Sequence, residues 1–232
     1  MSGQDITIPG PDGDFMGYLA TPEGLHGPGV VVIQEIFGVN DVMREIADDL
    51  ADKGFVALCP DLFWRIEPGI QLTDKTDEEW ARAFELFNTF DVDAGMKDIQ
   101  ATITHLRGLE PCTGTVGAIG YCLGGHLAYL TATRTDADCA VGYYGVNIPA
   151  KIDEAKNIKK PLMLHIAEKD EFVDAEAQKA MHAGLDDHPL VTLHDYEGMD
   201  HAFARVGGAH YDKDNATLAN DRTEYFLKEH LG

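Results

Sequence analysis

The chain has 232 residues, of which 44% are hydrophobic, and this is enough to build the core of one sizeable α/β domain. Its 40 acidic residues outnumber its 18 basic residues and give a net charge of -22. Because so acidic a chain repels phosphate backbones, we expect no nucleic-acid partner. Aspartate predominates over glutamate and lysines are few, which is also typical of proteins from a high-salt cytoplasm.

Residues 1–8 show no basic segment followed by an apolar one, and no apolar run approaches the roughly 20 residues that span a bilayer. We therefore expect a cytoplasmic protein with no membrane partner, either a monomer or a weak oligomer. The sequence has no HExxH motif, no Walker A motif and no GxGxxG after a strand, so neither a metal nor an organic cofactor is expected. The cysteines lack CxxC spacing, which favours a reducing compartment; they are Cys59, Cys112, Cys122 and Cys139.

Apolar runs and turn residues predict strands that alternate with helices along the chain. Residues 5–8 and 15–20 flank a turn at residues 11–14 and predict an antiparallel hairpin, and the apolar run at residues 29–34 is typical of a strand buried on both faces. Further strands are expected at residues 55–59, 115–119, 140–144, 162–166 and 191–194, and helices at residues 41–53, 76–88, 91–109, 126–134, 175–184 and 216–230. This order predicts a single α/β domain over residues 1–232, with a mostly parallel central sheet and helices on both faces.

One thiol lies where a buried strand is expected to turn into a helix. Residues 120–124 read Gly-Tyr-Cys-Leu-Gly, which is the nucleophile-elbow pattern G-x-S-x-G with Cys122 in place of serine. Its glycines let strand and helix approach closely, and the start of a helix favours a thiolate. The alternative is a small buried cysteine that merely fits the turn. The complete pattern favours a nucleophile, and the N–H of Leu123 would then help to bind an oxyanion.

A cysteine nucleophile needs a base and an acid, and the chain contains ten histidines. His201 follows the last expected strand, which agrees with the chain order of α/β-hydrolases: nucleophile, acid, then histidine. The acid is expected after the strand at residues 162–166, where Asp170 stands first and Asp174 second. For each of these side chains the alternative is a solvated loop residue. The combined order favours a catalytic role.

A further carboxylate, Glu35, comes directly after the buried run at residues 29–34. An acid at that position is costly to desolvate unless it is paired or functional, although it could also reach solvent from the loop. Because the carboxyl ends of the strands form the ligand-binding edge of such a sheet, a functional role is expected. The loop after Glu35 is also where a second oxyanion N–H is expected.

Together these residues resemble the dienelactone hydrolase family, the carboxymethylenebutenolidases. The resembling segments are residues 34–40, 59–62, 120–125, 141–145 and 201–205. The resemblance implies an α/β-hydrolase fold and a triad of Cys122, His201 and Asp170. It also implies that Glu35 contacts the resting thiol and helps to deprotonate it when substrate binds, and that Ile36 supplies the second oxyanion N–H. The implied reaction opens an unsaturated lactone, of the dienelactone-to-maleylacetate type, through an acyl-enzyme.

The substrate-binding residues depart from the family pattern at one position. Family members that act on dienelactone hold its carboxylate with two arginines, and Arg205 matches one of them. At the other position this chain has Trp80, with Arg82 two residues further along a helix and therefore on a different face. Trp80 is expected to form an apolar wall unless a small shift brings Arg82 into place. Phe37 and Tyr143 are further pocket candidates, although each could be ordinary core. We expect a small anionic lactone or ester as substrate.

Other functions stay open. Within the same fold, the chain could be a broad carboxylesterase whose substrates lack the carboxylate. From a different class, it could be a non-hydrolytic ligand-binding protein or a redox-sensing thiol protein. A cysteine peptidase is a third alternative, but no segment suggests an extended peptide groove. The combination of nucleophile, base, acid and Glu35 favours the hydrolase.

Overall fold

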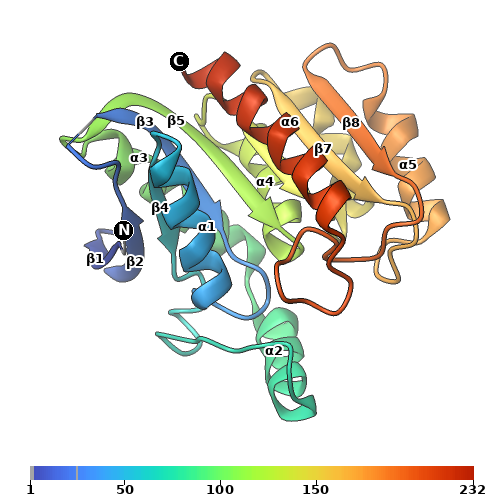
Figure 1. Cartoon of the computed structure of the whole chain (residues 1–232), viewed down its shortest axis with the longest axis horizontal. Coiled ribbons are helices and arrows are strands. Elements are labelled where there is room, and N and C mark those ends of the chain that lie inside the picture. The colour runs from blue at the N-terminus through green and yellow to red at the C-terminus, as the bar shows by residue number, and fades with distance from the viewer. Residues whose placement is uncertain (1–2, 25) are drawn as a thin grey trace. The chain divides into compact units, whose positions relative to one another are not determined.

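The computed structural model describes residues 3–24 and 26–232 (Figure 1). Eight strands of this described chain form a sheet with the order β1-β2-β4-β3-β5-β6-β7-β8. β1 and β2 pair in antiparallel fashion, as do β2 and β4, whereas the pairs β3–β4, β6–β7 and β7–β8 are parallel. The predicted α/β class, with a mostly parallel sheet and an N-terminal antiparallel hairpin, is confirmed.

The chain divides into two compact units, residues 1–118 and 119–232. The strands of the first unit are β1 (Gln4–Ile8), β2 (Phe15–Ala20), β3 (Gly27–Ile33) and β4 (Val56–Pro60), and its helices are α1 (Asp41–Asp52), α2 (Asp77–Thr89) and α3 (Val92–Arg107). The helices begin where the sequence predicts, because Asn40 and Thr76 accept the N–H of Met43 and of Glu79, each at 3.2 Å. In Figure 1, α1 lies beside β4.

β5 (Cys112–Tyr121) continues into the second unit. There follow α4 (Leu123–Arg134), β6 (Ala140–Tyr143), the 3₁₀-helix η1 (Ile148–Asn157), β7 (Leu162–Ala167), α5 (Ala175–Leu185), β8 (Val191–Tyr196) and α6 (Lys213–Leu231). In Figure 1, α6 runs alongside β7. All six residues of β7 are buried, as expected for a strand covered on both faces.

Three elements differ from the prediction. α4 begins at Leu123 and not at residue 126, because packing overrides the low helix propensity of the intervening glycines. α6 begins at Lys213, where Asp212 caps the helix by accepting the N–H of Asn215 at 2.9 Å. η1 is absent from the sequence-based prediction, and its short 3₁₀ turns give no amphipathic period to detect.

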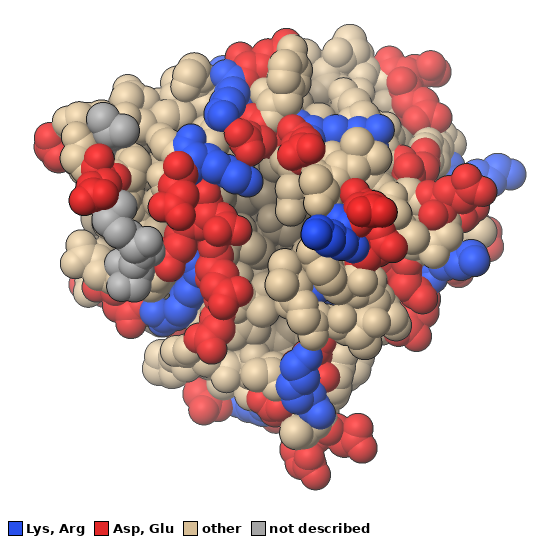
Figure 2. Space-filling view, viewed as in Figure 1, with Lys and Arg blue, Asp and Glu red and all other residues tan. Residues whose placement is uncertain are grey.

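Acidic side chains are prominent at the surface, and the cysteines are free. Figure 2 shows acidic side chains spread over the visible face, in agreement with the net charge of -22. All four cysteines belong to the described chain, and all are free thiols. None of the helices within residues 3–24 and 26–232 is both long and apolar enough to cross a bilayer.

Candidate functional site

The segment that joins β5 to α4 is a strained turn with Cys122 at its apex. Cys122 has φ 56° and ψ -113°, a conformation that costs a non-glycine residue of the order of 1–3 kcal/mol. A Cβ atom on Gly120 would lie 2.0 Å from the carbonyl oxygen of Gly124, and one on Gly125 would lie 2.5 Å from that of Tyr143. Both positions therefore require glycine; the sequence pattern suggested this steric reason for Gly120, whereas Gly125 lies outside the pattern.

Backbone hydrogen bonds hold this elbow in place. The N–H of Cys122 donates to the carbonyl oxygen of Tyr143 on β6 at 3.1 Å. The carbonyl oxygen of Cys122 accepts the N–H of Gly125 at 3.0 Å and that of His126 at 3.2 Å. Leu123 is the first residue of α4, so its N–H points out of the helix end, where negative charge is stabilised. The elbow therefore places the thiol next to an N–H group at the end of a helix; the oxyanion role of Leu123 stays a prediction.

His201 and Asp170 form a buried ion pair in the same unit. Nδ1 of His201 donates to Oδ2 of Asp170 at 2.7 Å, and the two side chains are 5% and 2% exposed. The other carboxylate oxygen of Asp170 accepts the N–H of Phe172 at 2.8 Å, which fixes its orientation. Asp174, the second candidate acid, instead caps α5 by accepting the N–H of Ala177 at 2.9 Å. The structure thus brings Asp170, and not Asp174, to the histidine.

The thiol completes a chain of three interacting side chains. Burial lowers the pKa of His201, but the negative charge of a Cys122 thiolate and hydrogen bonds to Asp170 and Cys122 outweigh this effect and raise the pKa to about 10. A histidine with such a pKa is protonated at neutral pH. The arrangement therefore favours an imidazolium that faces the sulfur on one side and the carboxylate on the other.

Two aromatic rings and a second histidine surround His201, and the sequence analysis missed all three. The ring of Tyr144 lies 5.1 Å from the imidazole and the ring of Phe172 4.8 Å from it, both edge-on. Nδ1 of His210 donates to the backbone carbonyl of His201 at 3.2 Å. Tyr144 directly follows β6 and Phe172 follows shortly after β7. Because ligand sites form beyond the carboxyl ends of such strands, these positions could have marked both residues as site candidates.

Glu35 and the residues after it form a buried loop at the carboxyl end of β3. Glu35, Ile36 and Phe37 are 2%, 5% and 2% exposed. Gln34 anchors the loop, because its Oε1 accepts the N–H of Leu62 at 3.0 Å. A Cβ on Gly38 would lie 2.0 Å from the carbonyl oxygen of Ile70, which requires glycine at that turn. The predicted contact between Glu35 and the thiol of Cys122, and the oxyanion role of Ile36, stay predictions.

The position of Trp80 supports its interpretation as an apolar wall. Its indole packs edge-on against Phe37, with ring centroids 5.0 Å apart, and stacks on Phe84 at 5.6 Å. Arg82 instead forms ion pairs with Glu67 and Glu85, each at 2.6 Å. Within the first unit, Phe37 in the loop after β3 therefore contacts Trp80 of α2, whereas the guanidinium of Arg82 is bound by Glu67 and Glu85.

The other two binding candidates lie in the second unit. Arg205 is partly buried in the turn that follows His201, and its N–H donates to the carbonyl oxygen of Ala202 at 2.9 Å. Tyr143 has no exposed surface, and its hydroxyl hydrogen-bonds Asn220 at 3.0 Å and Thr223 at 2.6 Å. Of the two interpretations of Tyr143, the structure favours the core residue.

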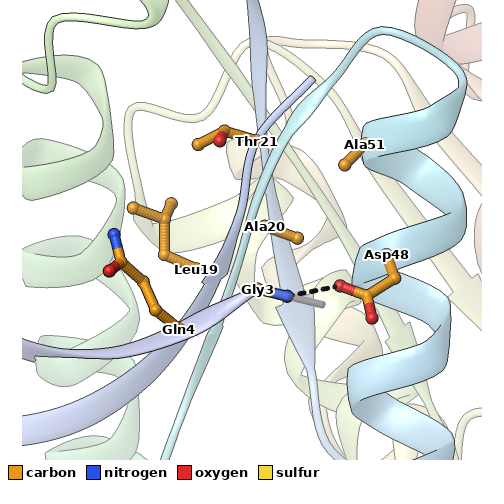
Figure 3. A pocket seen from close by; sticks show the side chains of 7 residues that line it. All are labelled: Gly3, Gln4, Leu19, Ala20, Thr21, Asp48 and Ala51. Atoms are coloured by element: carbon orange, nitrogen blue, oxygen red, sulfur yellow. Dashed lines mark hydrogen bonds between the residues drawn. The ribbon is translucent and has the colours of Figure 1, made fainter. Parts of the chain in front are cut away.

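A separate pocket of about 200 Å³ lies in the first unit (Figure 3). It is lined by Gly3, Gln4, Leu19, Ala20, Thr21, Asp48 and Ala51. Its main polar groups are used internally, since Asp48 accepts the N–H of Gly3 at 3.1 Å and the hydroxyl of Tyr18 at 3.0 Å. Because it contains none of the predicted catalytic residues, we assign no chemistry to it. In the described part of the chain, no group of three or more potential ligands could hold a metal ion.

Comparisons with known proteins agree along the length of the chain. The Dienelactone hydrolase family matches residues 15–231. A protein of Azospirillum brasilense is 50% identical over 240 residues, which cover 98% of this chain and 99% of that protein. The carboxymethylenebutenolidase of Pseudomonas sp. strain P51 is 40% identical over 216 residues, which cover 93% of this chain and 90% of that protein. That of Pseudomonas putida is 39% identical, with 98% and 97% covered.

Solved structures agree on the fold. A structure from Klebsiella pneumoniae superposes with a TM-score of 0.87 at 22% identity, and 97% of this chain and 98% of that chain are covered. The dienelactone hydrolase of Anabaena variabilis superposes with a TM-score of 0.72 at 15% identity, with both chains fully covered. At such identities the likeness shows the fold alone.

Proposed function

Because this chain belongs to the dienelactone hydrolase family, we propose that it is a cysteine hydrolase that opens an unsaturated lactone through an acyl-enzyme on Cys122. The observation that carries the mechanism is the strained elbow, whose thiol interacts with the buried pair of His201 and Asp170. We propose a lactone as the substrate because two relatives that are 40% and 39% identical to this chain are named carboxymethylenebutenolidase. We propose one hydrolase domain over residues 1–232.

In the acylation step, the Cys122 thiolate attacks the lactone carbonyl carbon and a C–S bond forms. The carbonyl oxygen becomes an oxyanion, which the N–H of Leu123 stabilises; the family resemblance adds the N–H of Ile36. The ring C–O bond then breaks and the electron pair moves to the ring oxygen. His201 donates its proton to that leaving oxygen, which in an unsaturated lactone becomes an enol and then a ketone.

In the deacylation step, the now neutral His201 removes a proton from water, and the hydroxide attacks the thioester. The C–S bond breaks and the thiolate is restored beside the imidazolium. Asp170 holds the imidazole with Nδ1 protonated, so that Nε2 can exchange the proton at the reaction centre, and it stabilises the cation that forms.

The substrate is proposed to be anionic, with its carboxylate bound by Arg205. Trp80 replaces the second arginine of the family pattern and packs on Phe37, so we propose an apolar wall at that side. Arg82 contributes little, because it is held by Glu67 and Glu85. Such a site favours a lactone with one carboxylate and a more apolar body than dienelactone itself.

Glu35 is proposed to control when the thiol reacts. A carboxylate near the thiol would oppose the thiolate that His201 favours, so the sulfur of the free enzyme would be less prone to oxidation until substrate displaces the acid. The burial of Glu35 supports this role, since an acid in that environment interacts strongly with any charge nearby.

The test is turnover of 4-carboxymethylenebut-2-en-4-olide and of p-nitrophenyl acetate, combined with mass spectrometry of the trapped enzyme. We expect lactone opening, an acyl adduct on the peptide that contains Cys122, and loss of both in Cys122→Ala. Cys112→Ala, which removes a more exposed free thiol outside the elbow, is the control and should retain activity. Preference for the acetate would favour the broad carboxylesterase. No adduct and no turnover on an ester panel would favour a ligand-binding or redox-sensing protein.

A further inference from the structure

Behind the elbow, buried polar side chains of β6, β7, β8 and α6 form a continuous hydrogen-bonded chain. We propose that Tyr143, His165 and Thr223 act as a positioning network that sets the geometry between the Cys122 thiol and the His201 imidazole. The inference rests on the proposed function, because it concerns the reacting pair of that site.

The centre of the network is His165 on β7, which is 1% exposed. Its Nδ1 lies 2.8 Å from the hydroxyl of Tyr196, and its Nε2 lies 2.9 Å from the hydroxyl of Thr223 on α6. The hydroxyl of Thr223 also lies 2.6 Å from that of Tyr143. One threonine therefore joins side chains of two neighbouring strands, β6 and β7, to the C-terminal helix.

The ends of the network determine the direction of its hydrogen bonds. Arg222 can only donate, and it donates to the hydroxyl oxygen of Tyr196 at 3.2 Å, so that hydroxyl is free to donate to Nδ1 of His165. Nε2 of His165 then donates to Thr223. At the other end Tyr143 donates to Oδ1 of Asn220 at 3.0 Å, and its oxygen accepts the proton of Thr223.

This arrangement requires a neutral His165. Burial, together with the nearby His194 and Arg222, holds the pKa of His165 well below its usual value. Every hydroxyl in the chain accepts one hydrogen bond and donates one, so the buried groups are satisfied by a single proton arrangement. A fully satisfied network of this kind fixes the positions of its members more strictly than an apolar core would.

The same residues hold the reacting pair through their backbones. The carbonyl oxygen of Tyr143 accepts the N–H of Cys122 at 3.1 Å, and that of His165 accepts the N–H of Tyr144 at 2.8 Å. Tyr144 has φ 37° and packs its ring on His201 at 5.1 Å. Tyr143 and His165, whose side chains both hydrogen-bond Thr223, therefore also bind the backbone on either side of the site. The carbonyl of Tyr143 holds Cys122, and that of His165 holds Tyr144, whose ring packs on His201.

The residues of the network do not touch the substrate; they affect the reaction by positioning Cys122 and His201. A side chain that acts in this way should affect turnover and thiol reactivity together, because both depend on the distance and alignment of sulfur and imidazole. A misplacement of about 1 Å can cost on the order of 100-fold in rate. A residue that only packs the core should lower stability and leave both rates unchanged.

The experiment compares Thr223→Val, which keeps the shape and removes the hydroxyl, with Thr223→Ser, which keeps the hydroxyl. The matched control is Thr102→Val in α3, since Thr102 is also buried and its hydroxyl donates to the backbone carbonyl oxygen of Asp98, one helical turn away, at 2.7 Å. Two rates are measured: kcat for ester hydrolysis, and alkylation of Cys122 by iodoacetamide as a function of pH, followed on the Cys122 peptide by mass spectrometry.

We expect Thr223→Val to lower kcat by roughly 10-fold to 100-fold and to shift the alkylation profile along the pH axis. Thr223→Ser should restore both, and Thr102→Val should match the wild type in both. If Thr223→Val does not fold, Tyr143→Phe is used instead. It removes the neighbouring hydroxyl, and we expect the same effects as for Thr223→Val: a lower kcat and a shifted alkylation profile.

Wild-type kcat and an unshifted alkylation profile in folded Thr223→Val would overturn the proposal and leave the network a packing feature. The alkylation arm does not require turnover. If the wild type hydrolysed no ester but Thr223→Val still shifted the profile, the proposed function would fail while the positioning of Cys122 stood.

Discussion

The carboxylate of Asp170 is the part of the site whose removal has the clearest expected result. Asp170→Asn keeps the size of the side chain and its acceptor for the N–H of Phe172, but it places an amide NH₂ against the protonated Nδ1 of His201. Two donors then face each other in a site where both side chains are almost fully buried. The neutral form of the imidazole is then expected to carry its proton on Nε2 instead of Nδ1, so that Nε2 cannot accept a proton from the thiol or from water.

The size of the effect follows from this buried contact. The corresponding change in a serine protease triad lowers kcat about 10⁴-fold, and here we expect a fall of roughly 10³-fold to 10⁴-fold, or about 4–5.5 kcal/mol in the barrier. The pKa of His201 should also fall from about 10, because Asp170 is one of the groups that raise it. Stability should decrease as well, since one member of a buried ion pair loses its partner.

The assay is kcat on p-nitrophenyl acetate, together with the pH titration of the His201 ring followed by NMR. Asp174→Asn is the matched control, because Asp174 lies four residues away, is exposed and only caps α5, a role that asparagine performs equally well. The control should keep wild-type kcat. If Asp170→Asn kept kcat within tenfold of the wild type while folded, Asp170 would not be the acid of the triad.

Three further changes test separate parts of the site and fold. Glu35→Gln should lower turnover and raise the alkylation rate of the free Cys122 thiol, since it removes a negative charge that disfavours the thiolate; unchanged values of both would make Glu35 a bystander. Arg205→Ala should raise KM for the carboxylate-bearing lactone by about 10-fold to 100-fold and leave p-nitrophenyl acetate unaffected, whereas equal effects on both substrates would refute carboxylate binding. His126→Gln should remove part of the acid sensitivity of the fold. Burial lowers the pKa of His126 to about 4, and its Nε2 has no hydrogen-bond partner among residues 3–24 and 26–232. The stability associated with neutral His126 is thus fully present above pH 6.5 and falls as the pH decreases from 6.5 to about 4, by roughly 3 kcal/mol in total. Chemical denaturation of both proteins between these pH values measures the difference, and parallel curves would contradict it.

Much of the fold was available from the sequence because its signals are local. The apolar run that became β3 and the capping residue Asn40 act over a few neighbouring positions. The elbow is local as well, since a Cβ on Gly120 would collide with Gly124 only four residues away. The start of α4 was predicted three residues late, because the packing of Gly125 on Tyr143 is a contact between distant segments.

The sequence by itself predicted the elbow at Cys122, which the structure contains, and proposed the roles of nucleophile, base and acid from their order along the chain. The sequence ranked Asp170 ahead of Asp174, but only the tertiary structure shows the contact, in which Nδ1 of His201 donates to Oδ2 of Asp170, 31 positions away, while Asp174 caps α5. Only the tertiary structure revealed the hydrogen bond from His165 to Thr223, whose partners are 58 positions apart. Local sterics can be read from spacing along the chain, whereas a buried hydrogen bond between distant segments exists only after the strands and helices have packed.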